Sequence, residues 1–169
     1  MTAADSPLPP AGRCTCFMVR RLARQLTALY DDALAGSGLT VTQYAALSTL
    51  ARAEEPLPVA RLAHALGMDR TTTSRLVHPL ERDGLLARAE GTQAAVDARA
   101  RPLIITGEGR RRLRVAIAGW EQAQRDVARA LGHELDASLR AVADAANRKL
   151  GEAGDCAARA KRPASKGHR

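Results

Sequence analysis

Apolar residues recur every three or four positions along most of this chain, which is the spacing of amphipathic helices. The pattern predicts one helix within residues 13–36, a long helix over about 107–131 and a last helix ending near residue 150. Residues 85–90 and 103–105 break this spacing and can form two short strands. The predicted fold class is therefore mainly α with a small β wing.

Three short helices are predicted in the middle of the chain. Thr40 and Gln43 fit a capping box, in which each side chain accepts the other residue's backbone N–H. Pro58 suits the first turn of the second helix, Gly67 ends it, and Asp69 caps the third. Two short helices joined by a turn of about three residues are typical of a helix-turn-helix when the second has a polar, basic outer face.

The helix that follows Asp69 has two contrasting faces. Thr73, Val77 and Leu80 fall on one stripe at helical spacing, so that stripe is expected to be buried. Short hydroxyls reach phosphates and base edges, and arginine reads guanine bidentately. An ordinary amphipathic surface helix is the alternative, but the neighbouring elements favour DNA binding. The candidate DNA contacts on this helix are Arg70, Thr71, Thr72, Ser74, Arg75, His78 and Arg82.

The two strands and the polar stretch 91–99 form a ribbon directly after this helix, which indicates a wing. Arg99 and Arg101 lie near its predicted tip, where a basic ribbon fits the adjacent minor groove. Pro102 is compatible with an edge strand only. The elements together predict a winged helix-turn-helix that binds double-stranded DNA.

Composition and charge agree with this prediction. Aromatic residues make up only 2% of the 169 residues, so leucine and alanine must build the core, which favours helices. The net charge of +8 indicates an anionic partner, most simply nucleic acid. A membrane surface is the other candidate anion, but no long apolar run supports it. No secretory signal is evident, and the odd number of cysteines favours reduced thiols, so we expect a cytoplasmic protein.

Cys14 and Cys16 stand in the first turn of the first helix. Two residues apart, they point to nearly opposite sides, which disfavours a shared metal or a mutual disulfide. A helix N-terminus lowers a thiol pKa, and Arg20 lies one turn beyond Cys16. Tyr30 could donate its hydroxyl if a second subunit brings it close. Cys16 is therefore a candidate redox residue, and a small buried apolar side chain is the alternative.

Nothing in the sequence indicates catalysis. There are no paired carboxylates, metal-ligand cluster or nucleophile–base motif, and Gly107-Glu-Gly109 lacks the third glycine of a dinucleotide loop, since that position is Arg112. We predict a non-enzyme without cofactor or metal. A sequence-tolerant architectural DNA-binding protein is the competing class.

The helices at both ends exceed what a winged helix needs, so we expect them to pair two copies and to present two recognition helices to a pseudo-palindromic site. A monomeric bundle is the alternative. The basic end of the chain either adds attraction to phosphates or has no role. The predicted organisation is a flexible tail (1–12), a dimerisation helix (13–36), a winged helix-turn-helix (37–106), two dimerisation helices (107–150) and a disordered basic tail (151–169).

Five short pieces of the sequence have a recognisable combined spacing: Leu39-Thr40 with Gln43, Val59-Ala-Arg-Leu62-Ala, Leu80-Glu-Arg-Asp-Gly84-Leu85, Asp97-Ala-Arg99 and Ile105-Thr-Gly-Glu-Gly109. This spacing resembles the MarR (multiple antibiotic resistance regulator) family of winged-helix transcription factors over about residues 14–150. The resemblance implies an obligate homodimer, with Arg99 in the minor groove. It also implies repression relieved by a small, often aromatic, ligand or by thiol oxidation. Pro79 inside the recognition helix and the few charges in the wing depart from the family pattern.

A narrower similarity concerns the organic hydroperoxide sensors of this family. Cys16 and Tyr30 match a reactive cysteine and one of its tyrosine partners, whereas Arg20 stands at the position of the second tyrosine. For a small-molecule effector, the resemblance and the scarcity of aromatic groups suggest a cleft between the dimer helices and the winged helix. Its candidate lining residues are Arg20, Arg24, Tyr30, Tyr44 and Trp120.

Overall fold

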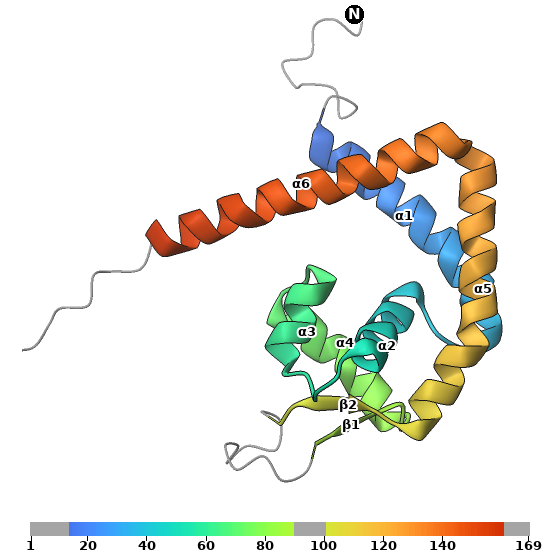
Figure 1. Ribbon diagram of the computed structural model, residues 1–169, viewed down its shortest axis with the longest axis vertical. Helices are drawn as coiled ribbons and strands as arrows, with labels where there is room; N and C mark the ends of the chain where they lie inside the picture. The colour runs from blue at the N-terminus through green and yellow to red at the C-terminus, as the bar shows by residue number, and fades with distance from the viewer. Residues whose placement is uncertain (1–13, 90–100, 161–169) are drawn as a thin grey trace, which may run out of the picture. The chain divides into compact units, whose positions relative to one another are not determined.

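The computed structural model describes residues 14–89 and 101–160, with side chains described as far as residue 151 (Figure 1). The chain forms two compact units, residues 1–124 and 125–169, whose boundary falls within a long helix. The elements in chain order are α1 (Thr15–Leu34), the 3₁₀ turn η2 (Ala35–Ser37), α2 (Val41–Arg52), α3 (Val59–Leu66), α4 (Arg70–Arg82), β1 (Leu86–Arg88), β2 (Leu103–Ile105), α5 (Gly107–Leu131) and α6 (His133–Ala160).

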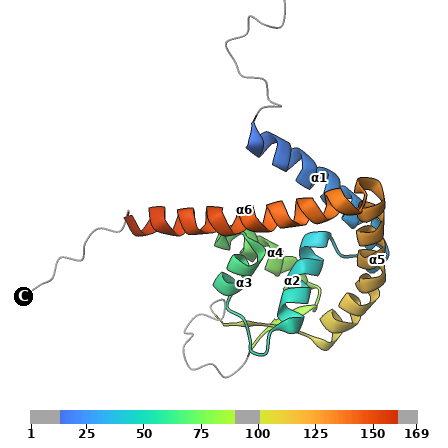
Figure 2. The same cartoon turned by 45° about the horizontal axis from the view of Figure 1, so that its top comes forward.

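The first unit contains the predicted winged helix. α2, α3 and α4 pack together beside the ribbon of β1 and β2, as both views show (Figures 1 and 2). The two strands are antiparallel, with Leu86 opposite Ile105 and Arg88 opposite Leu103. Leu57 adds a bridge to Leu103, exchanging backbone hydrogen bonds of 2.9 and 2.8 Å. The predicted fold class, mainly α with a small β wing, is confirmed.

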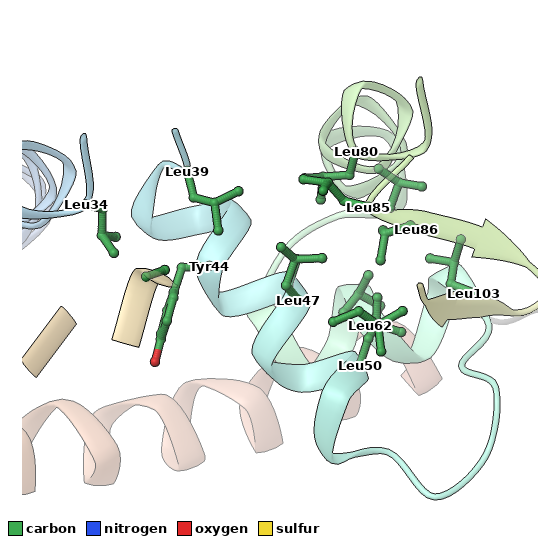
Figure 3. Packing of buried hydrophobic residues seen from close by; sticks show 14 residues of the cluster. Leu34, Leu39, Tyr44, Leu47, Leu50, Leu62, Leu80, Leu85, Leu86 and Leu103 are labelled. Carbon is green, nitrogen blue, oxygen red and sulfur yellow. The ribbon is translucent and has the colours of Figure 1, made fainter. Parts of the chain in front are cut away.

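Leucine side chains fill the core of this unit (Figure 3). Three completely buried leucines come from three different elements: Leu47 from α2, Leu62 from α3 and Leu103 from β2. Burying one such side chain stabilises the fold by roughly 1.5–3 kcal/mol. Tyr44 of α2 stacks on Trp120 of α5 with ring centroids 5.8 Å apart, and burial raises the pKa of the Tyr44 phenol. The scarce aromatic residues thus extend a core made mainly of leucine.

The start of α2 is held by three polar contacts. Thr40 Oγ1 accepts the Gln43 N–H at 3.2 Å and Gln43 Oε1 accepts the Thr40 N–H at 3.0 Å, which confirms the predicted capping box. Asp31 Oδ1 of α1 accepts the Val41 N–H at 2.6 Å. The contact from Asp31 was not predicted because it joins residues ten apart across a turn.

α4 runs without interruption through Pro79. Proline has no N–H, so the Arg75 carbonyl loses its helical donor. The helix nevertheless continues to Arg82, and Val77 and Leu80 on either side of the proline are buried. Their burial offsets the local cost of the missing hydrogen bond.

α6 is longer than predicted. We expected the last helix to end near residue 150 and a tail without regular structure to follow, but α6 continues to Ala160. Residues 151–160 are rich in alanine, the strongest helix former, and contain no proline. The part of the expected tail from residue 161, like the expected tail over 1–12, lies outside the described residues. No helix in the described ranges is long and apolar enough to cross a membrane.

Two glycines allow backbones to approach closely within the first unit. A Cβ on Gly109 would lie 2.2 Å from the Leu85 carbonyl oxygen, and a Cβ on Gly119 would lie 2.3 Å from that of Ala33. Thr106 reinforces the first contact, because its Oγ1 accepts the Gly109 N–H at 3.0 Å and donates to the Gly84 carbonyl at 2.7 Å. The predicted cap of α5 by Thr106 is therefore present and also connects α5 to the end of α4.

We predict that Gly109→Ala lowers the free energy of unfolding by about 1–3 kcal/mol, because the added methyl group overlaps a backbone oxygen that cannot move freely. Helix propensity alone predicts the opposite sign. Urea unfolding followed by circular dichroism measures the difference. Gly36→Ala is the control, because nothing lies within 4 Å of its added Cβ. Equal stability of both variants would contradict the close approach.

Candidate nucleic-acid interface

The turn between α3 and α4 has the geometry of a helix-turn-helix. Gly67 ends α3 in the left-handed region at φ 64°, and the Met68 N–H donates to the Ala63 carbonyl at 2.9 Å. Asp69 then caps α4, with Oδ1 accepting the Thr72 N–H at 2.8 Å. The predicted turn and cap are confirmed, and they fix the direction in which α4 leaves α3.

One face of α4 is anchored in the core. Thr73, Val77 and Leu80 are at most 1% exposed, and the Thr73 hydroxyl donates to the Asp69 carbonyl at 2.9 Å. The opposite face is exposed at every position predicted to contact DNA. We call this set the reading face: Arg70, Thr71, Thr72, Ser74, Arg75, His78 and Arg82.

The members of the reading face differ in how strongly they are held by the protein. The hydroxyls of Thr72 and Ser74 donate to Asp69 Oδ2 at 2.6 Å and to the Arg70 carbonyl at 2.8 Å. Arg82 pairs with Asp83 at 3.0 Å. Within the described ranges, Arg75 forms no ion pair or side-chain hydrogen bond, so its guanidinium group is available to an external acceptor such as a guanine edge.

A hollow of about 340 Å³ borders the reading face. It contains Glu81, the one acidic residue within α4. Glu81 forms a two-pronged ion pair with Arg88 of β1, at 2.5 and 3.2 Å. This pairing offsets the negative charge beside the reading face, which therefore keeps a positive character. The hollow is lined by Val59, Arg70, Ser74, His78, Glu81 and Arg88.

Sequence reasoning missed the pairing of Glu81 with Arg88. The two residues are seven apart, and Gly84 at φ 72° turns the chain between them, so no helical or strand spacing relates them. Of the predicted wing contacts, Arg101 lies two residues before β2, with its side chain half-buried. Arg99, with the rest of the Asp97-Ala-Arg99 motif, lies outside the described residues.

α1 carries the candidate redox residues and three of the five candidate effector residues. Cys14 is the N-cap of α1, Cys16 lies in its first turn, and both thiols are exposed and free. Arg20 and Arg24 line an open hollow of about 470 Å³ along α1, together with Asp31. Tyr30 is half-buried elsewhere on α1, and Tyr44 and Trp120 are engaged in their own stack. Of the five candidate effector residues, Arg20 and Arg24 therefore line the same hollow, and the three aromatic residues do not line it.

No cluster of three or more histidine, cysteine or acidic side chains suited to a metal occurs within residues 14–89 and 101–151. The candidate DNA, effector and redox residues of the described surface carry mainly arginine, hydroxyl and thiol groups. These groups can bind anions and bases, and a thiol can also be oxidised.

Comparison with known proteins agrees with this geometry. A family model described as MarR family matches residues 37–100. The M. tuberculosis transcriptional regulator MosR is 32% identical, with a TM-score of 0.68 over 85% of this chain and 97% of that one. MosR in complex with DNA is 33% identical, with a TM-score of 0.66 over 80% and 98%.

The PcaV transcriptional regulator from Streptomyces coelicolor, in complex with its natural ligand, is 26% identical, with a TM-score of 0.68 over 88% of this chain and 99% of that one. No curated protein sequence gives a significant match. The likeness to MosR exceeds 30% identity over nearly its whole length, so sequence and fold point to the same group of proteins.

The cap of α4 leads to a prediction about pH. The Thr72 hydroxyl, followed by the Thr72 N–H, holds the pKa of Asp69 below its ordinary value of 3.8. Because the folded state favours the charged form, this contribution to stability is present above about pH 4 and is lost as the pH falls through the lowered pKa. Asp69→Asn keeps a capping oxygen but cannot ionise.

We therefore expect urea midpoints measured at about pH 5 and about pH 3 to differ less in Asp69→Asn than in the wild type. Glu55→Gln, which removes an exposed carboxylate from the turn after α2, controls for the loss of one charge. If Asp69→Asn and the wild type lose the same stability on acidification, Asp69 does not act as a charged cap.

Proposed function

The chain belongs to the MarR family of DNA-binding transcriptional regulators, and on this premise we propose that it is a homodimeric repressor released from a pseudo-palindromic operator by a small ligand. The observation that carries the proposal is the reading face, on which Arg75 is exposed, opposite the buried stripe of Val77 and Leu80, and forms no ion pair with a described residue. α4 enters the major groove in this proposal, and Arg99 and Arg101 of the wing reach the flanking minor groove.

Two considerations support a homodimer in this proposal. One chain presents one recognition helix, whereas a pseudo-palindromic site needs two. The terminal helices also leave much apolar surface uncovered: the 20-residue helix α1 has a single buried residue, Leu34. Such surface favours association. The exposed large apolar residues on α1, α5 and α6 are Phe17, Met18, Val19, Val115, Ile117, Leu135, Val142 and Leu150.

The proposed effector is a small anionic, aromatic molecule. Arg20 and Arg24 supply donors for a carboxylate along the α1 hollow. Asp31 lines the same hollow and also accepts the N–H of Val41 at the start of α2. A ligand that displaces Asp31 would therefore weaken the attachment of α1 to the winged helix. PcaV, at 26% identity, is described with a natural ligand bound.

Oxidation of Cys16 is the alternative signal. Its thiol is free and exposed in the first turn of α1, where an oxidant can reach the sulfur. A hydroperoxide would transfer one oxygen to the Cys16 sulfur, giving a sulfenic acid, and would itself be reduced to an alcohol. Tyr30 would assist only if the second subunit brings it near.

We predict that Arg75→Ala lowers the preference for the operator over random DNA by about 10- to 100-fold while salt-sensitive binding to any duplex remains. The measurement is competition binding to a duplex that the wild type selects from a random pool. Arg129→Ala, on α5 outside the winged helix, removes one charge as the control. An unchanged preference in Arg75→Ala would mean that another face reads the bases. If the wild type itself showed no preference for any DNA sequence, the result would support a sequence-tolerant architectural DNA-binding protein instead.

We predict that Val142→Asp converts the dimer into monomers at micromolar concentration, because the new carboxylate would be desolvated in an apolar interface. Sedimentation equilibrium measures the association. Ala141→Asp introduces the same charge about 100° around α6 from Val142, away from the side of Leu135, Leu139 and Leu150, where the side chain is also exposed, and should remain dimeric. Dissociation of both variants, or of neither, would contradict the placement of the interface.

Titration of the operator complex distinguishes the two signals. We expect an aromatic carboxylic acid to weaken operator binding about tenfold or more, a typical allosteric coupling. Arg24→Ala should need a higher ligand concentration, and Cys16→Ser should respond like the wild type. Release of the wild type by an organic hydroperoxide, lost in Cys16→Ser, would instead support thiol sensing.

A further inference from the structure

Arg88 connects three parts of the winged helix. Its Nε and Nη2 donate to Glu81 Oε1 and Oε2, at 2.5 and 3.2 Å, on the last turn of α4. Its Nη1 donates to the backbone carbonyl of Arg101, at 3.0 Å, just before β2. Arg88 itself lies at the end of β1. One guanidinium group therefore joins the recognition helix to both strands of the wing.

This contact differs from the other ion pairs of the described chain. The Arg88 and Glu81 side chains are 22% and 26% exposed, whereas the partners in the Arg82–Asp83 pair are 70% and 52% exposed. Half-burial and two-pronged geometry reduce competition from water and salt. Exposed pairs of single contacts contribute little in comparison. The Glu81–Arg88 pair is thus suited to hold a fixed geometry.

We infer that Glu81 and Arg88, with the Arg101 carbonyl, form a clamp that sets the position of the wing relative to α4. The two residues are positioning residues: they fix the distance between the groups that enter the major groove and Arg101, which faces the minor groove in the proposed function. The inference rests on that proposed function. Beyond that function, it assigns Glu81 and Arg88 the role of positioning α4 and the wing so that both grooves can be bound at the same time.

The direction in which Glu81→Gln changes DNA affinity distinguishes the clamp from simple electrostatic attraction. Glu81→Gln removes a negative charge beside the reading face, so electrostatic attraction to phosphate alone predicts tighter DNA binding. The clamp predicts weaker binding, because a neutral amide holds Arg88 less well than a carboxylate. Arg88→Lys keeps the positive charge but lacks the planar fork that spans two carboxylate oxygens and a carbonyl.

The experiment uses full-length protein and the duplex selected by the wild type. Dimethyl sulfate methylates guanine N7 in the major groove and adenine N3 in the minor groove, so one reagent reports on both grooves. We expect Glu81→Gln and Arg88→Lys each to bind about tenfold more weakly. They should lose protection of adenine N3 at the flanks and keep protection of guanine N7. Glu108→Gln, which breaks the exposed pair with Arg111, is the matched control and should behave as wild type.

A double variant tests whether the two residues act as a unit. Glu81→Gln combined with Arg88→Lys should bind no more weakly than the weaker single variant, since either change already opens the clamp. Fully additive losses would overturn the inference. A purely structural role would lower N7 and N3 protection together, in proportion to the unfolded fraction seen by circular dichroism, and would also overturn it.

The remaining outcomes separate this inference from the proposed function. Tighter binding by Glu81→Gln, with a wild type that protects its selected duplex, overturns the clamp and leaves the proposed function standing. A wild type that selects and protects no duplex overturns the proposed function and the clamp with it.

Discussion

The burial of one face of α4 is the constraint on which the rest of this structure depends. Val77 and Leu80 are held in a leucine core, and Thr73 satisfies its hydroxyl against the backbone of Asp69. A helix fixed in this way cannot rotate about its axis, so the residues on its other side must face solvent. The position of Arg75 in space therefore follows from the packing of the buried residues on the other side of α4.

Close backbone contacts extend this constraint from α4 to the terminal helices. Gly109 brings α5 against Leu85, directly after the turn that ends α4, and Gly119 brings α5 against the end of α1. Interiors packed this densely transmit displacement rather than absorb it. Asp31, which binds the start of α2, adds a polar connection between α1 and the winged helix. A ligand beside α1 can in this way affect helices that form the DNA-binding unit.

The wing is held by a different kind of contact. β1 and β2 are three residues long each, too short to define an orientation through backbone pairing alone. The bridge from Leu57 to Leu103 and the Arg88 contacts to Glu81 and Arg101 supply the missing attachments. Short strands fixed at several points give the described part of the ribbon a set position beside α4.

Local signals in the sequence determined the element types, the capping box at Thr40, the cap at Asp69 and the identity of both faces of α4, because each depends on residues within a few positions of one another. The length of α6 was underestimated, since alanine-rich sequence without an apolar period can still be helical. The Glu81–Arg88 pair, the bond from Asp31 to Val41 and the separation of Arg20 and Arg24 from the Tyr44–Trp120 stack were decided only by the tertiary structure. These contacts join residues across turns or between helices that are distant in the sequence. Periodicity along the chain indicates only local structure, so it cannot predict which of these side chains meet in the folded protein.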